Sequence, residues 1–338
     1  MNKKIGIITF WGVPNYGAWT QAYALNKVLT NLKGNTYDVE HIAYLTDHHY
    51  LSYYRNDMKL LNNFKYNWNQ IPHSMTMTEK DLEDSFYDVI ITGSDSIWEF
   101  SMDTTDNDRH LIGNDLKTNN LIAYAASAGV SVNENKDYIV DGLKKYNAIA
   151  VRDIATKRMV EKLTGIKSTI VPDPSILYDF SGDNSIPTNS FENYIFVYGI
   201  KWDKGFVEGL KQFASDRSLK LVSVGYINDW CDYNFRLIEI RAKEWIGLIK
   251  QSSYVATSMF HGLMVGLNLG KHVFFDRVPY VVNRSESLLS ITGMPFYSEK
   301  SNDEVKNIFD VAWNKEKINN GLNSFRKVGL EFLNGNIQ

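Results

Sequence analysis

The segment from Thr257 to Gly262 carries the residue best suited to acid–base chemistry. An apolar strand is expected over residues 254–257, and His261 then falls in the first turn of an apolar helix. The positive end of a helix dipole disfavours a protonated ring there, so the imidazole stays neutral near neutral pH, as a general base must. A structural histidine fits the same position, and both roles stay open. Ser258, delivered by the same strand, is a candidate substrate ligand.

Two further polar residues follow expected strands in the first half of the chain. Arg152 comes directly after the apolar run at 148–151, and a guanidinium can hold a phosphate or carboxylate through two parallel hydrogen bonds. The alternative is a surface ion pair with Asp153. Asp173 stands between two prolines that fix its backbone, so it serves either as a ligand contact or as part of a rigid turn.

Two loops near the amino terminus carry the remaining candidate ligands. The expected strand over 5–10 leads into Asn15, Tyr16 and Gly17, where a glycine allows close approach and a helix start offers amides to an anion. A plain strand-to-helix turn is the alternative. Asp95 follows the strand over 88–92, where it can orient a sugar hydroxyl, act as a base, or cap the next segment.

The elements that must position these residues alternate between short apolar strands and helical periodicity. This alternation predicts an α/β fold with parallel, doubly wound sheets. The strands are expected over 5–10, 39–45, 88–92, 121–126, 148–151, 168–171, 194–198, 220–224, 254–257 and 272–275. The helices are expected over 18–32, 136–146, 154–163, 204–213, 242–251, 260–269, 302–313 and 321–333.

A turn-rich stretch divides the chain into two Rossmann-like halves. We predict a first domain over 1–180, a linker over 181–193 and a second domain over 194–320, with a helix at 321–338. Residues 47–80, rich in Tyr, Asn and His, interrupt the first domain as an insertion that is either a lid or decoration. Two such halves are expected to face a cleft, where small ligands usually bind.

Composition excludes several classes. The net charge of −3 gives no basic excess for nucleic acid. The single cysteine, Cys231, permits no internal disulfide and no thiolate metal cluster. No apolar run approaches the roughly 20 residues of a membrane span, and the first strand is too short for a signal peptide core. We therefore expect a cytoplasmic protein, and we expect no metal site because no spacing typical of metal ligands stands out.

Five segments occur together in an order that resembles the polysaccharide pyruvyl transferase family. Each is short, and their order makes the resemblance specific. They are Asn15-Tyr16-Gly17-Ala18 with Gln21 to Leu25, Gly93-Ser94-Asp95-Ser96-Ile97-Trp98, Val151-Arg152-Asp153, Asp173-Pro174-Ser175-Ile176-Leu177 and Ser258-Met259-Phe260-His261-Gly262.

The resemblance implies a fold like the GT-B glycosyltransferases and an active site in the interdomain cleft. It implies phosphoenolpyruvate as co-substrate, no further cofactor, and a saccharide acceptor that is often on a lipid or nucleotide carrier. A lipid-linked acceptor would bring peripheral membrane contact. It also implies that His261 is catalytic and that Arg152 holds the donor. Relatives often carry Arg or Ser where this chain has Met259, so donor binding here would lean on other cations, with Lys201 and Arg241 as candidates.

The expected reaction joins two hydroxyls of one sugar to C2 of the enolpyruvyl group as a cyclic ketal, with phosphate leaving. His261 would take a proton from the attacking hydroxyl, while Arg152 and the amides near Gly17 would neutralise the donor. Two alternatives remain open. One is a GT-B glycosyltransferase that uses a nucleotide sugar, and the other is a non-catalytic carbohydrate-binding relative.

Overall fold

The computed structural model describes residues 2–44, 57–102, 105, 108–129, 137–298 and 308–337. The chain folds as two compact units, the first formed by Met1–Tyr178 with Phe325–Gln338 and the second by Asp179–Ser324. The long helix α12 (Lys315–Asn336) therefore begins in the second unit, and its residues from Phe325 onward belong to the first. No helix of the described ranges is long and apolar enough to cross a bilayer.

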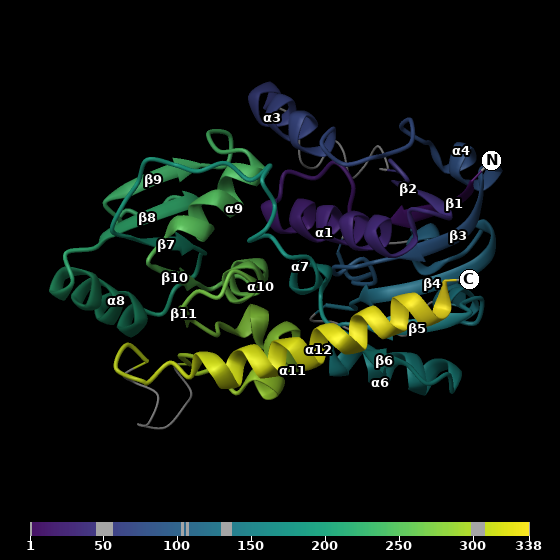
Figure 1. The fold of residues 1–338 in the computed structure, drawn as a ribbon. Helices are drawn as coiled ribbons and strands as arrows, with labels where there is room; N and C mark the ends of the chain where they lie inside the picture. Colours follow the sequence, from purple (N-terminus) through teal and green to yellow (C-terminus); the bar gives the residue numbers. More distant parts are fainter. Residues whose placement is uncertain are drawn as a thin grey trace. The chain divides into compact units, whose positions relative to one another are not determined.

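The first unit is built on a six-stranded parallel sheet with the order β2-β1-β3-β4-β5-β6 (Figure 1). Its strands are β1 (Lys3–Ile8), β2 (Tyr37–His41), β3 (Phe86–Thr92), β4 (Lys117–Ala126), β5 (Ala148–Val151) and β6 (Thr169–Ile170). β3 and β4 end in continuous buried runs, which is typical of strands covered on both faces.

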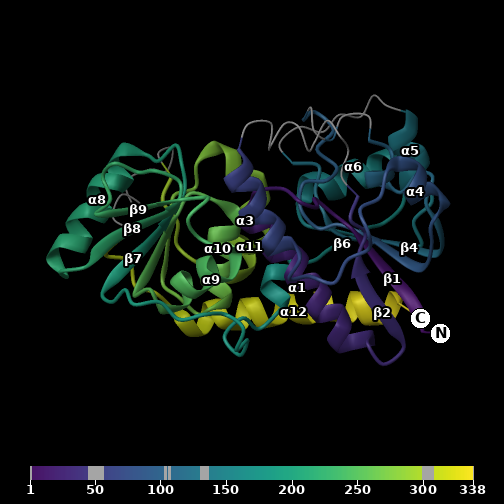
Figure 2. The ribbon, with the colours of Figure 1, turned by 90° about the horizontal axis from the view of Figure 1, so that it is seen from above.

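Helices cover both faces of this sheet. On one face, α1 (Tyr16–Lys33), α7 (Pro174–Leu177) and the second half of α12 share a core with β1, β3 and β4. The other face is covered by α4 (Glu79–Asp84), the short 3-10 helix η1 (His110–Ile112), α5 (Asp137–Leu143) and α6 (Ile154–Thr164). Figure 2 shows α1 and α12 on one side of the strands and α5 and α6 on the other.

The described part of the predicted insertion, residues 57–80, is anchored to the first unit. Within it, α3 (Met58–Trp68) buries Phe64 and Trp68. The Trp68 indole donates to the Val13 carbonyl at 3.0 Å, and the Trp19 indole of α1 donates to the Asn67 carbonyl at 2.7 Å. These bonds favour decoration over a lid for this part, and residues 47–56 lie outside the described residues.

The second unit carries a five-stranded parallel sheet with the order β11-β10-β7-β8-β9. Every residue of β7 is buried, so both faces of this strand are covered. The strands are β7 (Tyr194–Tyr198), β8 (Lys220–Gly225), β9 (Tyr233–Arg236), β10 (Tyr254–Thr257) and β11 (Val273–Phe275). The helices are α8 (Lys204–Asp216), α9 (Ala242–Gln251), α10 (Phe260–Asn268), the 3-10 helix η2 (Pro279–Val281) and α11 (Val282–Thr292).

One predicted helix is wrong where it can be checked. Residues 308–313 form turns and irregular chain, while 302–307 lie outside the described residues. Ile308 is buried, and Phe309 packs at ring distances of 4.9–6.0 Å against Phe274, Phe206 and Phe213. The apolar residues of this stretch therefore serve tertiary packing onto α8 and β11, which overrides their helical spacing.

Candidate functional site

The carboxyl ends of β7 and β10 lie side by side at the point where the strand order of the second sheet reverses. The chain moves from β7 to β8 on one side and returns to β10 on the other. Open α/β sheets bind ligands beyond the carboxyl ends of their strands at such a switch point. The loop after β7 and the turn from β10 into α10 meet here, and they define the candidate site of the second unit.

His261 lies in the first turn of α10, as the sequence predicts. Met259 caps this helix without a side-chain hydrogen bond, and no acidic residue follows in the first turn. The imidazole is half-buried and contacts the Phe260 ring edge-to-face at 5.2 Å between centroids. The Nε2 atom itself is buried, so only part of the residue reaches solvent.

Ser258 lies inside the turn and does not face solvent. Its hydroxyl accepts a hydrogen bond from the Ile200 amide at 3.1 Å and donates to the Ile200 carbonyl at 2.8 Å. A side chain on Gly199 would place its Cβ 2.2 Å from this hydroxyl, so only glycine allows the two loops to approach this closely. Ser258 therefore fixes the geometry of the loop. Its hydroxyl is not exposed, so the structure offers no group of Ser258 for the predicted role as a substrate ligand.

Of the two alternative cations, Lys201 lies at the switch point. It is exposed, three residues beyond the last paired residue of β7, and it adopts a left-handed backbone with φ of +55°. Such a conformation costs a non-glycine residue on the order of 1 kcal/mol and is often found where function fixes the chain. Arg241 precedes α9 and is also exposed, but its amide is taken by the Glu244 carboxylate at 2.7 Å.

Aromatic residues surround this edge of the second sheet. The Tyr198 ring contacts Tyr226 at 5.3 Å between centroids, and it also lies against Gly262 of α10. Burial raises the pKa of Tyr226, with a smaller contribution from Tyr280. Tyr280 is 46% exposed, with the Arg284 guanidinium 4.5 Å above its ring. The sequence analysis missed Tyr226 and Tyr280 because no pattern places the two loops together.

In the first unit, Arg152 lies within a buried polar network at the carboxyl edge of the sheet. Its NH1 donates to Asp173 at 3.1 Å and to Asp95 at 3.3 Å, and its NH2 donates to the Ser96 hydroxyl at 3.1 Å. The side chains of Arg152, Asp173 and Asp95 are 2%, 0% and 13% exposed. Arg152 and Asp173 thus contact each other directly, which the sequence did not predict.

The charge of Arg152 is balanced inside the protein. Burial alone would lower its pKa, but the carboxylates of Asp95, Asp173 and Asp153 outweigh this effect, and the pKa is raised. Asp153 does not form the surface pair that was the alternative for Arg152, because it is buried, caps α6 and accepts a 2.6 Å hydrogen bond from Ser127. A guanidinium held this way can orient Asp95 but has little charge left for a phosphate.

The helix start near Gly17 is already occupied. The Asn15 side chain caps α1 by accepting hydrogen bonds from the amides of Gly17 at 2.8 Å and Ala18 at 3.1 Å. Tyr16 is fully buried, with its ring 5.8 Å from that of Phe64. An anion would have to displace Asn15 to reach these amides, so the structure brings these three predicted ligands together as a helix cap.

The network extends to residues that the sequence analysis did not select as site residues. Gln21 of α1 donates to the Thr9 hydroxyl at 2.9 Å and accepts from the Ser94 hydroxyl at 3.0 Å. Ser94 also contacts Asp173 at 3.1 Å. Thr9 follows β1 and Ser94 follows β3, which flank the switch point of the first sheet. Gln21 belongs to the sequence motif around Asn15, and that motif was the signal in the sequence that could have identified Gln21 as a site residue.

Glu83, His110 and Asp115 bring potential ligand atoms within 4.8 Å of one another in the described part of the chain. The ring nitrogens of His110 contact carboxylates on both sides, Glu83 at 3.0 Å and Asp108 at 3.3 Å. Burial alone would lower the pKa of His110, but these two carboxylates outweigh it and the pKa is raised. Both ring nitrogens of His110 are therefore engaged by carboxylates of the protein itself.

The two parallel sheets with their helical layers define an α/β protein of the GT-B type. A putative UDP-N-acetylglucosamine 2-epimerase from Listeria monocytogenes superposes with a TM-score of 0.55 at 10% identity, covering 94% of this chain and 90% of that one. The UDP-GlcNAc 2-epimerase from Neisseria meningitidis, solved with UDP-GlcNAc, gives 0.55 at 11% identity over 99% and 100%. At these identities the likeness shows the fold alone.

The family is shown by sequence. A family model described as polysaccharide pyruvyl transferase matches residues 15–275, and the chain belongs to this family. The matched range contains Arg152 with its network and also His261 with its turn. No curated protein sequence matches the chain.

Proposed function

We propose that this protein transfers a pyruvyl group from phosphoenolpyruvate to two hydroxyls of one sugar, in the cytoplasmic synthesis of a cell-surface or exopolysaccharide. The first hydroxyl adds to C2 of the enolpyruvyl group while C3 takes a proton. The second hydroxyl then displaces phosphate from C2, and its proton leaves with the phosphate. The product is a cyclic ketal. Membership of the family supports a pyruvyl group as the group that is transferred. The phosphoenolpyruvate donor is part of the proposal.

The placement of His261 is the observation that carries this proposal. It lies at the switch point of the second sheet, in a helix start without a side-chain cap, and the residue is half-buried with its Nε2 enclosed. The imidazole there can take the proton of the attacking sugar hydroxyl and pass it on. The reaction needs proton transfers at both hydroxyls, and an imidazole can both accept and donate a proton.

Lys201 is the cation that we assign to the donor in the second unit. It is exposed beside the turn that carries His261, and its left-handed backbone is held by a loop tied to Ser258. An ammonium there compensates for the apolar Met259. The exposed Tyr280 after β11 offers a ring face to the acceptor, since sugar rings pack well on aromatic surfaces.

Arg152 has a positioning role in this proposal. Its guanidinium holds Asp95 and Asp173, so the group that it presents toward solvent is the Asp95 carboxylate, which is 13% exposed. Asp95 adopts a left-handed backbone with φ of +72°, which a loop must enforce on a non-glycine residue. A fixed carboxylate of this kind can accept a hydrogen bond from a sugar hydroxyl.

The test is acceptor-dependent release of phosphate from phosphoenolpyruvate by the purified chain, with and without a panel of diol-bearing oligosaccharides. His261→Gln should lower turnover by at least about a hundredfold, the usual contribution of a general base. The matched control is His272→Gln, which should leave turnover near normal. His272 directly precedes β11 and so lies at the amino-terminal ends of the strands, whereas His261 follows the carboxyl end of β10. Near-normal turnover of His261→Gln would refute the assigned role.

A nucleotide-sugar glycosyltransferase is the second candidate, because solved proteins with this fold were captured with UDP or UDP-GlcNAc. Thermal shifts separate the two candidates, since a ligand that binds only the folded state raises its stability. Stabilisation by phosphoenolpyruvate but not by UDP is expected. The reverse result favours the second candidate, and sugar binding without any phosphate release favours a non-catalytic relative.

A further inference from the structure

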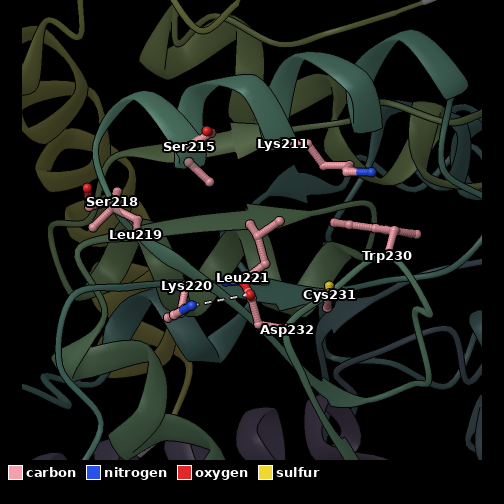
Figure 3. A pocket seen from close by; sticks show the side chains of 10 residues that line it. Lys211, Ser215, Ser218, Leu219, Lys220, Leu221, Trp230, Cys231 and Asp232 are labelled. Atoms are coloured by element: carbon pink, nitrogen blue, oxygen red, sulfur yellow. Dashed lines mark hydrogen bonds and ion pairs between the residues drawn. The ribbon is translucent and has the colours of Figure 1, made fainter.

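A pocket of about 570 Å³ opens in the second unit beside the second half of α8, the start of β8 and the β8–β9 loop. Figure 3 shows Lys211 extending from the helix and Trp230 from the loop on the same side of the pocket, with Leu221 beside them toward its centre. A volume of this size suits a ligand of one or two sugar rings, within the range of small-molecule sites. None of the residues assigned to the proposed transfer reaction lines it.

Several polar groups of the pocket have no hydrogen-bond or ion-pair partner among the described residues. The Lys211 ammonium, the Ser215 and Ser218 hydroxyls and the Trp230 indole N–H belong to this set. The indoles of Trp68 and Trp98 each donate to a backbone carbonyl instead. The pocket therefore offers an ammonium, an indole donor and two hydroxyls that a hydroxyl-rich ligand can engage.

The lining carries a surplus of positive charge. Its only carboxylate among the described residues is Asp232, which accepts the Leu221 amide at 2.8 Å and pairs with Lys220 at 3.6 Å. Lys211 remains without an ion pair in the described chain, so the pocket favours a ligand with one negative charge.

The rest of the lining selects among small anions. Trp230, Leu219 and Leu221 supply an apolar surface, including the flat face of an indole. Among the described residues no arginine lines the pocket, so no guanidinium is available to hold a phosphate through two parallel hydrogen bonds. Burial raises the pKa of the Cys231 thiol to about 12, so it stays neutral and adds no anionic ligand for a metal.

We propose that this pocket is a second sugar site, which binds a carboxylate-bearing saccharide of one or two rings. The carboxylate would contact Lys211, the ring would pack on Trp230, and the serine hydroxyls would exchange hydrogen bonds with the sugar. The inference stands on the chemistry of the lining and does not require the transfer reaction. It predicts binding in the absence of phosphoenolpyruvate.

The test is a ligand-observed NMR titration of the full chain with methyl β-D-glucuronide, methyl β-D-glucoside and inorganic phosphate. The glucuronide should bind at least about tenfold more tightly than the glucoside, because only the former pairs with Lys211. Lys211→Glu and Trp230→Ala should each weaken glucuronide binding by about tenfold or more. Lys317→Glu, an exposed reversal on α12 in the same unit, is the matched control and should leave binding unchanged.

Equal binding of the glucuronide and the glucoside would overturn the proposal, as would unchanged binding in both pocket variants. Tighter binding of phosphate at the same residues would also overturn it, since the pocket would then be a phosphate site. Folding of each variant is checked by circular dichroism, and Lys211→Met, which removes the charge but retains the stem, separates loss of the ion pair from loss of structure. Phosphate release is measured separately, so failure of this site and failure of the proposed transferase activity stay distinguishable.

Discussion

Ser258 and Ile200 are joined by two hydrogen bonds through a single hydroxyl. The Ser258 Oγ accepts from the Ile200 amide and donates to the Ile200 carbonyl, at 3.1 Å and 2.8 Å. This pair ties the loop after β7, which carries Lys201, to the turn after β10, which carries His261. One buried side chain therefore helps to fix the relative position of the proposed donor cation and the proposed base, together with the pairing of β7 and β10.

Ser258→Ala should impair both stability and catalysis. It leaves a buried amide and a carbonyl without their partner, so we expect a loss of about 1–3 kcal/mol in the free energy of unfolding. The loop would also loosen, raising KM for phosphoenolpyruvate more than a purely structural change would. Urea unfolding and steady-state kinetics measure the two effects. Ser253→Ala, an exposed serine before β10, should change stability by less than about 0.5 kcal/mol, and equal losses in both variants would contradict the argument.

The sequence predicts the strands of the sheet centres well. β5, β7 and β10 coincide with the expected ranges at both ends because continuous apolar runs stand between turn residues. β9 was missed because it is an edge strand with no buried residue, and α11 because its serine-rich sequence has little helical signal. The predicted helix over 302–313 is wrong in its described part because Ile308 and Phe309 fill a core.

The candidate sites show the same division. The place of His261 follows from one strand and one helix, both visible in the local sequence. The surroundings of Arg152 cannot be predicted from the local sequence. Asp95 and Asp173 contact Arg152 only because β3, β5 and β6 align in one sheet. Local patterns indicate which residues stand at strand ends, but they do not indicate which of them become buried.

Arg152→Met should destabilise the first unit strongly. The change leaves Asp95 and the fully buried Asp173 without their counter-charge, and breaking a buried pair by removing one partner costs about 3–5 kcal/mol. Chemical denaturation measures the loss. Arg158→Met, an exposed arginine on α6, is the matched control and should cost less than about 0.5 kcal/mol. Adding Asp173→Asn to Arg152→Met should recover part of the loss, and a strictly additive double variant would count against a coupled network.

Asn15→Ala should weaken the start of α1. The substitution removes the side-chain acceptor of the Gly17 and Ala18 amides, and loss of such a cap costs about 0.5–2 kcal/mol. Asn15→Asp keeps the acceptor and should retain stability. If these amides bind the donor's phosphate instead, Asn15→Ala should tighten binding of phosphoenolpyruvate, which calorimetry would detect.

The ion pairs of His110 predict a pH-dependent contribution to stability. Its pKa in the folded state is raised by Asp108 and Glu83, which outweigh burial, above the value of about 6.5 in an unfolded chain. The folded state therefore binds the proton more tightly. This stabilisation is complete below about pH 6.5, and it is lost as the pH rises through the raised pKa of the folded state.

Urea unfolding of the wild type and of His110→Gln at about pH 5.5 and about pH 8.5 measures this contribution. The difference between the two proteins should be larger at the lower pH. His41, whose pKa is lowered to about 4 mainly by burial, works in the opposite direction but is present in both proteins, so its effect cancels. Glu83→Gln removes one of the two carboxylates and should reduce the pH-dependent difference without abolishing it. A difference that is the same at both pH values would show that Asp108 and Glu83 do not raise the pKa of His110 in the folded state.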